Sequence, residues 1–250
     1  MPEAGKWLVA AYQPVSLFSL RMTHATSKGG KTLVVPTPYV IKMALIDVCF
    51  RRYPAAEALP QARAIFNMVK GRTVRFRPPE HCVVQNTFIK VLDQSREKGD
   101  GPFRQTIVYR EFAFFSGRLE IAVDVIGLDA ANISTLSSLF AHINSFGKRG
   151  GFWQFLDSDV IDGPLIGFTI PRDQADLIEL ASYAMTQALD DFGEPLWAAK
   201  DGFERISTYD SGEVTLNKHR QLTLTAIPYR RRSAGRGFTW YERVPDLPRP

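Results

Sequence analysis

The sequence predicts an α+β fold whose strands and helices follow the order βαββαβ. Three observations lead to this fold class. The chain has 250 residues, of which 45% are hydrophobic, so it can bury a sizeable core as one large domain or two small ones. Two long strand-like stretches, residues 73–91 and 105–126, flank a polar connection and predict an extended hairpin. Helical patterns precede this hairpin and follow it.

The first half of the unit is predicted to contain a strand and two helices. Residues 7–20 are rich in apolar and β-branched side chains, which is typical of a strand. A helix should begin near Thr37, because threonine caps helix N-termini and Pro38 suits the first helical position. A second, shorter helix at residues 61–70 ends at Gly71.

The second half is predicted to contain a helix, a loop and a strand. Residues 128–145 carry apolar side chains at helical spacing, namely Ile133, Leu136, Leu139, Phe140 and Ile143. A glycine-rich loop at residues 147–151 follows directly, and the aromatic residues at 152–155 predict the last strand. The full order is that of a ferredoxin-like, RNA-recognition-motif-type domain.

A smaller, β-rich part is predicted after residue 163. Its elements are, in order, a strand, a helix and two strands, at residues 165–170, 172–192, 203–208 and 222–227. The residues from 229 onward form a basic tail. We therefore divide the chain into a ferredoxin-like domain at residues 1–163 and a C-terminal α/β extension with a basic tail at residues 164–250.

Composition limits the partners that the chain can have. The chain carries 31 Lys and Arg against 26 Asp and Glu, a formal charge of +5, which permits an anionic partner without requiring one. Cys49 and Cys82 lie in apolar contexts outside any ligand pattern, which predicts buried free thiols in a reducing, cytoplasmic compartment. No metal site and no cofactor is predicted. Neither a signal peptide nor an apolar run near the ~20 residues of a membrane span is present, so no membrane partner is expected.

The loop Gly147-Lys148-Arg149-Gly150-Gly151 is the first candidate binding site. Glycines let main-chain N–H groups approach a ligand closely, and the two adjacent cations can pair with phosphate oxygens. The alternative is a plain turn between a helix and an aromatic strand, with two solvated cations. The position of the loop after the second helix favours a nucleic-acid role.

Two further basic segments are candidates for phosphate binding. Arg75 and Arg77 alternate with apolar residues, so on a strand both guanidinium groups would lie on one face. Arg230, Arg231 and Arg232 begin the basic tail and could contact RNA or a partner subunit. Solvated edge cations and an untethered tail are the respective alternatives.

The glycine-rich loop and the start of the first helix resemble the CRISPR-associated RAMP superfamily. The residues that carry the resemblance are Gly147-Lys148-Arg149-Gly150-Gly151-Phe152 and Pro36-Thr37-Pro38-Tyr39. The layout is most similar to the fifth Cas family, in which the long hairpin between the second and third strands forms a thumb. Here the thumb would be residues 77–107, and the resemblance covers about residues 7–155.

The resemblance implies a non-catalytic subunit that caps the 5′ handle of crRNA in a class 1, Cascade-type surveillance complex. Its implied partners are the crRNA and the backbone and large subunits, with target DNA nearby. One subtype instead uses its family member to cleave precursor RNA. A metal-independent endoribonuclease resembling the sixth Cas family is therefore a second hypothesis, and an RNA-recognition-motif protein without CRISPR partners is a third.

Metal-independent RNA cleavage needs a base, an acid and a cation at the reacting atoms. His24 is the catalytic candidate among four histidines, because its loop follows the first strand and can approach RNA. No motif assigns it an acid or base partner, so a binding role is the leading hypothesis.

Overall fold

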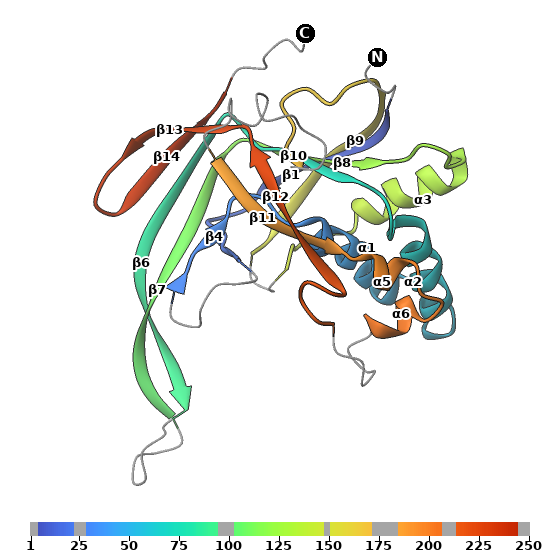
Figure 1. The fold of residues 1–250 in the computed structure, drawn as a ribbon, viewed down its shortest axis with the longest axis horizontal. Coiled ribbons are helices and arrows are strands. Elements are labelled where there is room, and N and C mark those ends of the chain that lie inside the picture. The colour runs from blue at the N-terminus through green and yellow to red at the C-terminus, as the bar shows by residue number, and fades with distance from the viewer. Residues whose placement is uncertain are drawn as a thin grey trace.

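The computed structural model describes residues 5–22, 29–94, 103–147, 151–171, 185–206 and 214–244. It consists of mainly antiparallel sheets with few helices, which agrees with the mixed α and β class predicted from the sequence. The longer helices gather on one side of the body, and a long hairpin projects away from it (Figure 1). This hairpin is called the thumb below.

The first sheet has the strand order β5-β8-β1-β9, and each neighbouring pair is antiparallel. Its strands are β1 (Lys6–Pro14), β5 (Val74–Arg77), β8 (Leu119–Asp124) and β9 (Trp153–Asp162). The two central strands are the most buried, since Leu8, Ala10, Leu119 and Ile121 are at most 1% exposed. The sheet therefore forms one wall of the main hydrophobic core.

Three helices accompany this sheet, namely α1 (Pro38–Arg52), α2 (Ala55–Val69) and α3 (Ala130–Phe140). Two of them, α1 and α3, begin at a residue whose side chain caps the helix. The Thr37 hydroxyl accepts a hydrogen bond from the Val40 amide at 3.3 Å, and the Asp129 carboxylate accepts one from the Asn132 amide at 2.7 Å. The predicted start of the first helix is thus confirmed, while the predicted helix at residues 61–70 is the second half of α2.

The thumb belongs to a second sheet, with the order β13-β14-β6-β7-β3. Its strands are β3 (Gly29–Gly30), β6 (His81–Gln94), β7 (Phe103–Ser116), β13 (Tyr229–Ala234) and β14 (Phe238–Arg243). Strands β6 and β7 pair continuously from His81 with Ser116 to Gln94 with Phe103. The extended hairpin predicted from the sequence is present, and it runs further toward the C-terminus than the predicted 77–107.

Two smaller sheets complete the fold. One has the order β10-β12-β11 and consists of β10 (Ile170–Pro171), β11 (Met185–Phe192) and β12 (Arg220–Ile227). The other pairs β2 (Leu20–Arg21) with β4 (Thr32–Leu33). Two helical turns, α5 (Glu194–Trp197) and α6 (Gly202–Arg205), lie between β11 and β12.

The C-terminal third contains the predictions that were wrong. The predicted helix at residues 172–192 is the strand β11 over Met185–Phe192, paired throughout with β12; residues 172–184 lie outside the described residues. The predicted strand at 203–208 begins instead as the turn α6. Of the predicted strand at 165–170, only Ile170 enters a strand, β10.

The predicted basic tail is part of the second sheet. Strand β13 pairs with β14, and β14 pairs with β6 of the thumb. Tyr229 is fully buried and its hydroxyl donates to the Pro79 carbonyl at 2.9 Å, so main-chain pairing and a buried side chain both fix the segment. One core contains buried residues from Leu8 to Tyr229, so the parts divided at residue 163 share a hydrophobic core.

Both cysteines are buried and free of disulfides, as expected from their apolar contexts. Burial raises the pKa of Cys49 to about 11 and also raises that of Cys82. Within the described part of the chain, no helix is long and apolar enough to cross a membrane. The same residues contain no group of three or more His, Cys, Asp or Glu side chains that could hold a metal ion.

Candidate nucleic-acid interface

A groove of about 500 Å³ lies where the base of the thumb meets the body. Its walls come from separate places in the sequence. These are the segment Leu17–Arg21, Leu33, the start of α1, the thumb strands, the ends of the glycine-rich loop with the first residue of β9, and the β11–β12 sheet. The side chains on which the following argument depends are Arg110 and Phe112 of β7, Trp153 of β9, and Asp190 and Arg220 of the β11–β12 sheet. The groove therefore joins elements that the sequence keeps far apart.

The floor of the groove is held by side chains that bond to main-chain groups of β4 and of the next residue. The Thr32 amide donates to the Glu111 carboxylate of the thumb at 2.9 Å. The Val34 amide donates to the Gln187 side-chain oxygen of β11 at 3.0 Å. Because Thr32 and Gln187 are both buried, these bonds replace the hydrogen bonds to water that the main chain gives up on folding. The segment before α1 is thereby fixed between the thumb and β11.

Arg110 is the cation that the thumb contributes to the groove. Its side chain passes over Gly30 of β3, where a Cβ atom would lie 2.6 Å from the Arg110 Cδ. Glycine at position 30 therefore leaves the room that Arg110 occupies. Within the described part of the chain, Arg110 has no carboxylate within ion-pair distance.

Arg220 contributes a second guanidinium group to the groove. In the described structure and unlike Arg110, it lies beside a carboxylate. Its Nε donates to the Asp190 carboxylate at 2.7 Å, and its guanidinium group lies 4.2 Å from the centre of the Tyr39 ring. Asp190 is only 1% exposed, so the pair is well shielded from water. Burial raises the pKa of Tyr39, and the neighbouring Arg220 opposes that shift. Arg220 is thus a fixed wall of the groove, with most of its charge offset by Asp190.

The two ends of the glycine-rich loop also line the groove. An antiparallel bridge joins Ser145 to Phe152 and closes the loop at its base. Gly147 has a φ of 71°, a conformation that favours glycine, and no atom lies within 4 Å of the position of its missing Cβ. Trp153, directly beyond the bridge, is 2% exposed and packs against Phe146.

Lys148, Arg149 and Gly150 lie outside the described residues, as does the catalytic candidate His24. Gly147 and Gly151, by contrast, are part of the groove wall. The structure thus brings the base of the loop to a groove that also contains Arg110.

The basic strand predicted at Arg75 and Arg77 lies elsewhere, on β5. The alternation is as predicted, because Val74 and Phe76 are buried and the arginines lie on the opposite face. Arg77 Nε lies 2.7 Å from the Glu120 carboxylate, and the Arg75 guanidinium group stacks over the Trp7 ring at 5.8 Å. Neither arginine lines the groove.

A segment around Leu165–Thr169 lies beside β5, on the face that carries Arg75 and Arg77. The Thr169 amide donates to the Phe76 carbonyl at 2.7 Å, and the Phe76 amide donates to the Thr169 hydroxyl at 3.0 Å. Leu165 and Phe168 of the same segment pack in a small apolar cluster with Ala122 of β8. Within the described structure, the two arginines therefore lie beside a packed segment and have contacts of their own.

Arg230, Arg231 and Arg232 lie on β13, the outer edge of the second sheet. All three are exposed. Arg230 and Arg232 both approach the Glu242 carboxylate, at 3.2 and 3.5 Å, so two guanidinium groups share one carboxylate. These residues do not line the groove and belong to a separate basic edge.

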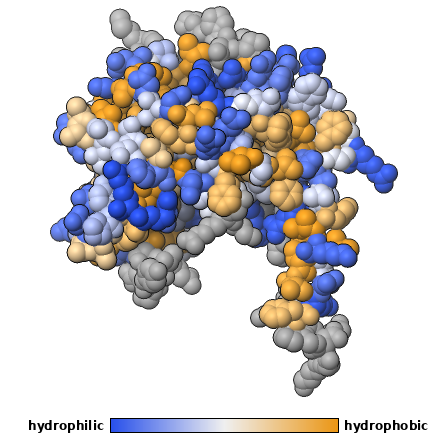
Figure 2. Space-filling model, turned by 180° about the vertical axis from the view of Figure 1, so that it is seen from behind, coloured by the Kyte–Doolittle hydropathy of each residue, from blue (hydrophilic) through white to orange (hydrophobic). Residues whose placement is uncertain are grey.

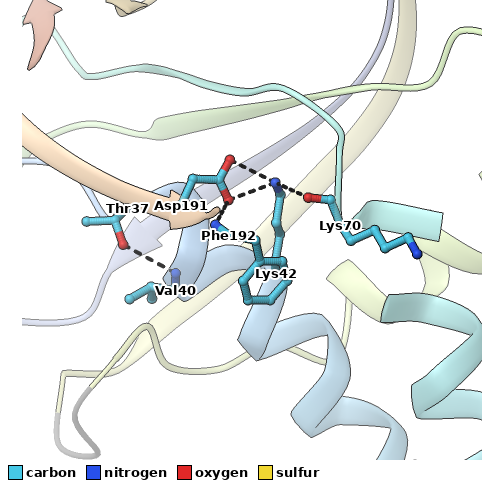
Figure 3. Close-up of polar contacts among 6 residues, drawn as sticks. All are labelled: Thr37, Val40, Lys42, Lys70, Asp191 and Phe192. Atoms are coloured by element: carbon cyan, nitrogen blue, oxygen red, sulfur yellow. Dashed lines mark hydrogen bonds and ion pairs between the residues drawn. The ribbon is translucent and has the colours of Figure 1, made fainter. Parts of the chain in front are cut away.

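A buried ion pair fixes α1 against β11, next to the groove (Figure 3). Lys42 is 1% exposed, and its Nζ lies 2.7 Å from one Asp191 carboxylate oxygen while donating to the Lys70 carbonyl at 3.2 Å. Burial lowers the pKa of Lys42, and the Asp191 carboxylate acts against this shift. Because Asp190 directly precedes Asp191, the Lys42–Asp191 pair also positions Asp190, the carboxylate that pairs with Arg220 in the groove wall.

Sequence reasoning missed Arg110 and Arg220 as members of the site. Arg110, Phe112 and Phe114 occupy every second position along β7, so they lie on one face of the strand. This alternation is the sequence signal for a face that carries both a charge and aromatic rings. Arg220 follows Lys218 and His219 in a basic cluster, but His219 is buried and accepts a hydrogen bond from the Thr215 amide. Only the pairing of β12 with β11 brings Arg220 to the groove.

Comparison with known proteins finds sequence similarity to a CRISPR-associated protein. No protein-family model matches the chain. It is 23% identical over 127 residues to the CRISPR-associated protein Cas5 of Archaeoglobus fulgidus, covering 50% of this chain and 54% of that protein. The chain thus aligns with about half the length of this curated relative.

Two solved structures are similar to the whole chain at low identity. A CRISPR protein from Archaeoglobus fulgidus gives a TM-score of 0.47 at 12% identity, over 96% of this chain and 92% of that chain. A chain of the Type III-B Cmr-beta complex bound to cognate target RNA gives a TM-score of 0.38 at 12% identity, over 94% and 86% of the two chains. The sequence match to the curated relative confirms the resemblance inferred from the loop and the first helix: this chain is similar to CRISPR-associated proteins, and among them to Cas5.

Proposed function

We propose that this chain is an RNA-binding subunit of a class 1 CRISPR effector complex, which holds the 5′ end of crRNA in the groove at the base of the thumb. The observation that carries the proposal is the meeting of Arg110, the ends of the glycine-rich loop and the start of α1 around one groove. The sequence similarity to a Cas5 protein supports the assignment to a CRISPR complex.

We also propose that β1, β5, β8 and β9, with their helices, are the ferredoxin-like unit predicted from the sequence. In this assignment β1, β5, β8 and β9 are the first, second, third and fourth strands along the chain. Their order in the sheet, β5-β8-β1-β9, is therefore second, third, first, fourth. All neighbours are antiparallel, as a βαββαβ unit of this kind requires. The thumb is then an insertion between the second and third strands, and α1 and α2 together take the place of the first helix.

The groove offers the two kinds of contact that single-stranded RNA needs. Arg110 supplies a guanidinium group for a phosphate, and Phe112, two residues further along the same strand face, supplies a ring. The main chain at Gly147 can approach the RNA closely because no side chain stands in the way. Lys148 and Arg149 remain proposed phosphate contacts that extend this surface.

The proposed role is binding rather than cleavage. The described residues that line the groove include cations and rings but no histidine, lysine or tyrosine that would complete an acid–base pair. Cleavage of precursor RNA by a group such as His24 is the alternative that an experiment must separate from binding.

The thumb is a surface for neighbouring subunits in this proposal. Phe88, Leu92, Phe103 and Ile107 are each 60% or more exposed. The register of the hairpin puts all four on one face. Phe88 pairs directly with Tyr109, Leu92 lies an even number of residues from Phe88, and Ile107 and Phe103 lie an even number of residues from Tyr109. Apolar side chains run along the projecting hairpin (Figure 2). A backbone subunit of the complex is the proposed partner of this face, with the large subunit and target DNA nearby.

The test uses the purified full chain and a labelled RNA that carries the repeat-derived 5′ handle, in EDTA. Arg110→Ala should weaken binding about tenfold to a hundredfold, as expected when a charge-assisted hydrogen bond is removed. The matched control is Arg205→Ala, which removes an exposed arginine of α6 that pairs with Asp201. This variant should bind as the wild type does. Lys148→Ala with Arg149→Ala should lower the slope of binding against salt by about one unit for each phosphate that the variant no longer neutralises.

Two outcomes would contradict the proposal. Equal affinities for Arg110→Ala and the wild type would remove the groove as the binding site. Specific cleavage of the repeat RNA in EDTA would replace the binding role with the endoribonuclease alternative.

A further inference from the structure

The second sheet has an outer face that extends beyond the groove. Pairing along the sheet puts Phe114, Val83, Trp240 and Ser233 in one row across strands β7, β6, β14 and β13. A neighbouring row contains Phe112, Gln85 and Phe238. Residues that pair directly share a face of the sheet, so these rings lie on the same side.

This side faces away from the core. The residues between those of the outer face, Cys82, Val84, Ala113 and Phe115, are at most 9% exposed and pack into the main core. Phe114 is 50% exposed and Phe238 is 42% exposed. Two large aromatic rings are therefore presented to solvent on a surface that main-chain pairing holds rigid.

Basic side chains lie on the edge strand of the same sheet, and the pairing of Arg230 with Glu242 and of Glu242 with His81 puts Arg230 on this face. Arg230 and Arg232 of β13 have side chains that are 52% and 57% exposed and share the single carboxylate of Glu242. The hairpin from Tyr229 to Arg243 contains five arginines and one glutamate. A second guanidinium group at this carboxylate leaves an excess of positive charge on the edge strand of this face.

We propose that this outer face is a second nucleic-acid surface, which binds a single strand by stacking unpaired bases on Phe114 and Phe238 while Arg230 and Arg232 contact its phosphates. Exposed rings on a sheet with arginines at its edge match the chemistry of an unpaired strand, whose bases offer flat faces and whose backbone is anionic. Protein partners are the competing occupants, and the excess of arginine over carboxylate at the edge favours the polyanion. Phe112 belongs to both surfaces, since it lines the groove and lies in the row of Phe238, so a strand that leaves the groove can continue onto this face.

The experiment measures binding of the full chain to labelled 12-nucleotide oligouridine and oligodeoxythymidine, and to an abasic phosphodiester of equal length. The double variant Phe114→Ala with Phe238→Ala should bind the two base-bearing strands about fivefold to a hundredfold more weakly for each ring that stacks a base. The abasic strand should bind both proteins alike. The two base-bearing probes show whether RNA or DNA is preferred, and either preference supports the proposal.

Two control variants keep the test decisive. Phe50→Ala removes a ring of similar exposure, 51%, from α1 and should bind as the wild type does. Phe114→Tyr with Phe238→Tyr keeps both rings and should retain wild-type affinity, whereas a merely misfolded sheet would not be rescued in this way.

Unchanged binding of base-bearing strands by the double alanine variant would overturn the proposal and point to a protein partner for this face. An equal weakening for the abasic strand would overturn base stacking. Arg110→Ala tested with handle RNA reports on the groove independently, so failure of this inference, which rests on a face beyond the groove, is distinguishable from failure of the proposed function.

Discussion

Whether an arginine is ion-paired within the fold depends on the carboxylates that lie near it. Arg77 lies against Glu120, and Arg220 lies against the buried Asp190, so the charge of each is balanced within the fold. Arg110 has no such neighbour in the described structure, although its sequence context gives no sign of this. The charge pattern of a sequence therefore indicates that cations are present, while the distribution of carboxylates in space determines which of them are ion-paired within the fold.

Gly30 is predicted to control the position of Arg110. A Cβ at position 30 would lie 2.6 Å from the Arg110 Cδ and 3.0 Å from the Tyr109 carbonyl oxygen, so Gly30→Ala must displace the arginine or the strand. Affinity for handle RNA should then fall toward that of Arg110→Ala. Gly71→Ala is the matched control, because nothing lies within 4 Å of its added carbon. Filter binding compares the variants, and full affinity in Gly30→Ala would show that Arg110 does not depend on this space.

At the scale of the elements, local signals were predictable and long-range pairing was not. Thr37 and Asp129 cap α1 and α3 through residues three positions away, which is information that the sequence displays directly. Residues 185–192 place Met185, Leu189 and Phe192 at spacings that suit a helix, yet they form β11. Pairing with β12, which lies well beyond β11 along the chain, overrides the local pattern.

The turn α6 shows the opposite error. Phe203 and Ile206 gave the segment a strand-like composition, but Arg205 reaches back to Asp201 across one helical turn. Phe203 then packs against Phe66 of α2, with ring centres 5.7 Å apart. A contact between distant elements thus stabilises a helical turn that composition does not indicate.

The ion pair between α1 and β11 is predicted to contribute strongly to stability. Asp191→Ala leaves the buried Lys42 without its carboxylate and should lower the free energy of unfolding by about 3 kcal/mol, the lower end for a buried pair because Asp191 is one-third exposed. Asp47→Ala breaks an exposed pair with Arg51 and should cost less than about 0.5 kcal/mol. Urea unfolding measures both differences, and similar small decreases in the two variants would contradict a structural role for the buried pair.

At the scale of the whole molecule, the N-terminal and C-terminal parts form one body. The C-terminal hairpin extends the thumb sheet. Strand β11 supplies Gln187, which accepts a hydrogen bond from the Val34 amide, and Asp190, which lines the groove. A division at residue 163 therefore describes the sequence pattern, while the groove needs residues from both sides of that boundary.

The candidate site was predictable to a limited extent. The ends of the glycine-rich loop were singled out by their composition, and they do lie at the groove. The basic strand at Arg75 and Arg77 was chosen for its alternation, but alternation does not reveal the segment at Leu165–Thr169 that packs beside it. Arg110 and Arg220 could not be assigned to one groove, because the pairing of β7 with β3 and of β11 with β12 is set by contacts distant in sequence.

The central claim is that handle RNA lies in the groove at the base of the thumb. The most direct measurement is photocrosslinking of the full chain to RNA with 4-thiouridine at successive handle positions, followed by identification of the crosslinked peptides. The account predicts crosslinks to peptides that contain Leu17–Arg21, Arg110 and the glycine-rich loop. Crosslinks confined to the outer surfaces of α2 and α3, with none to these peptides, would contradict it.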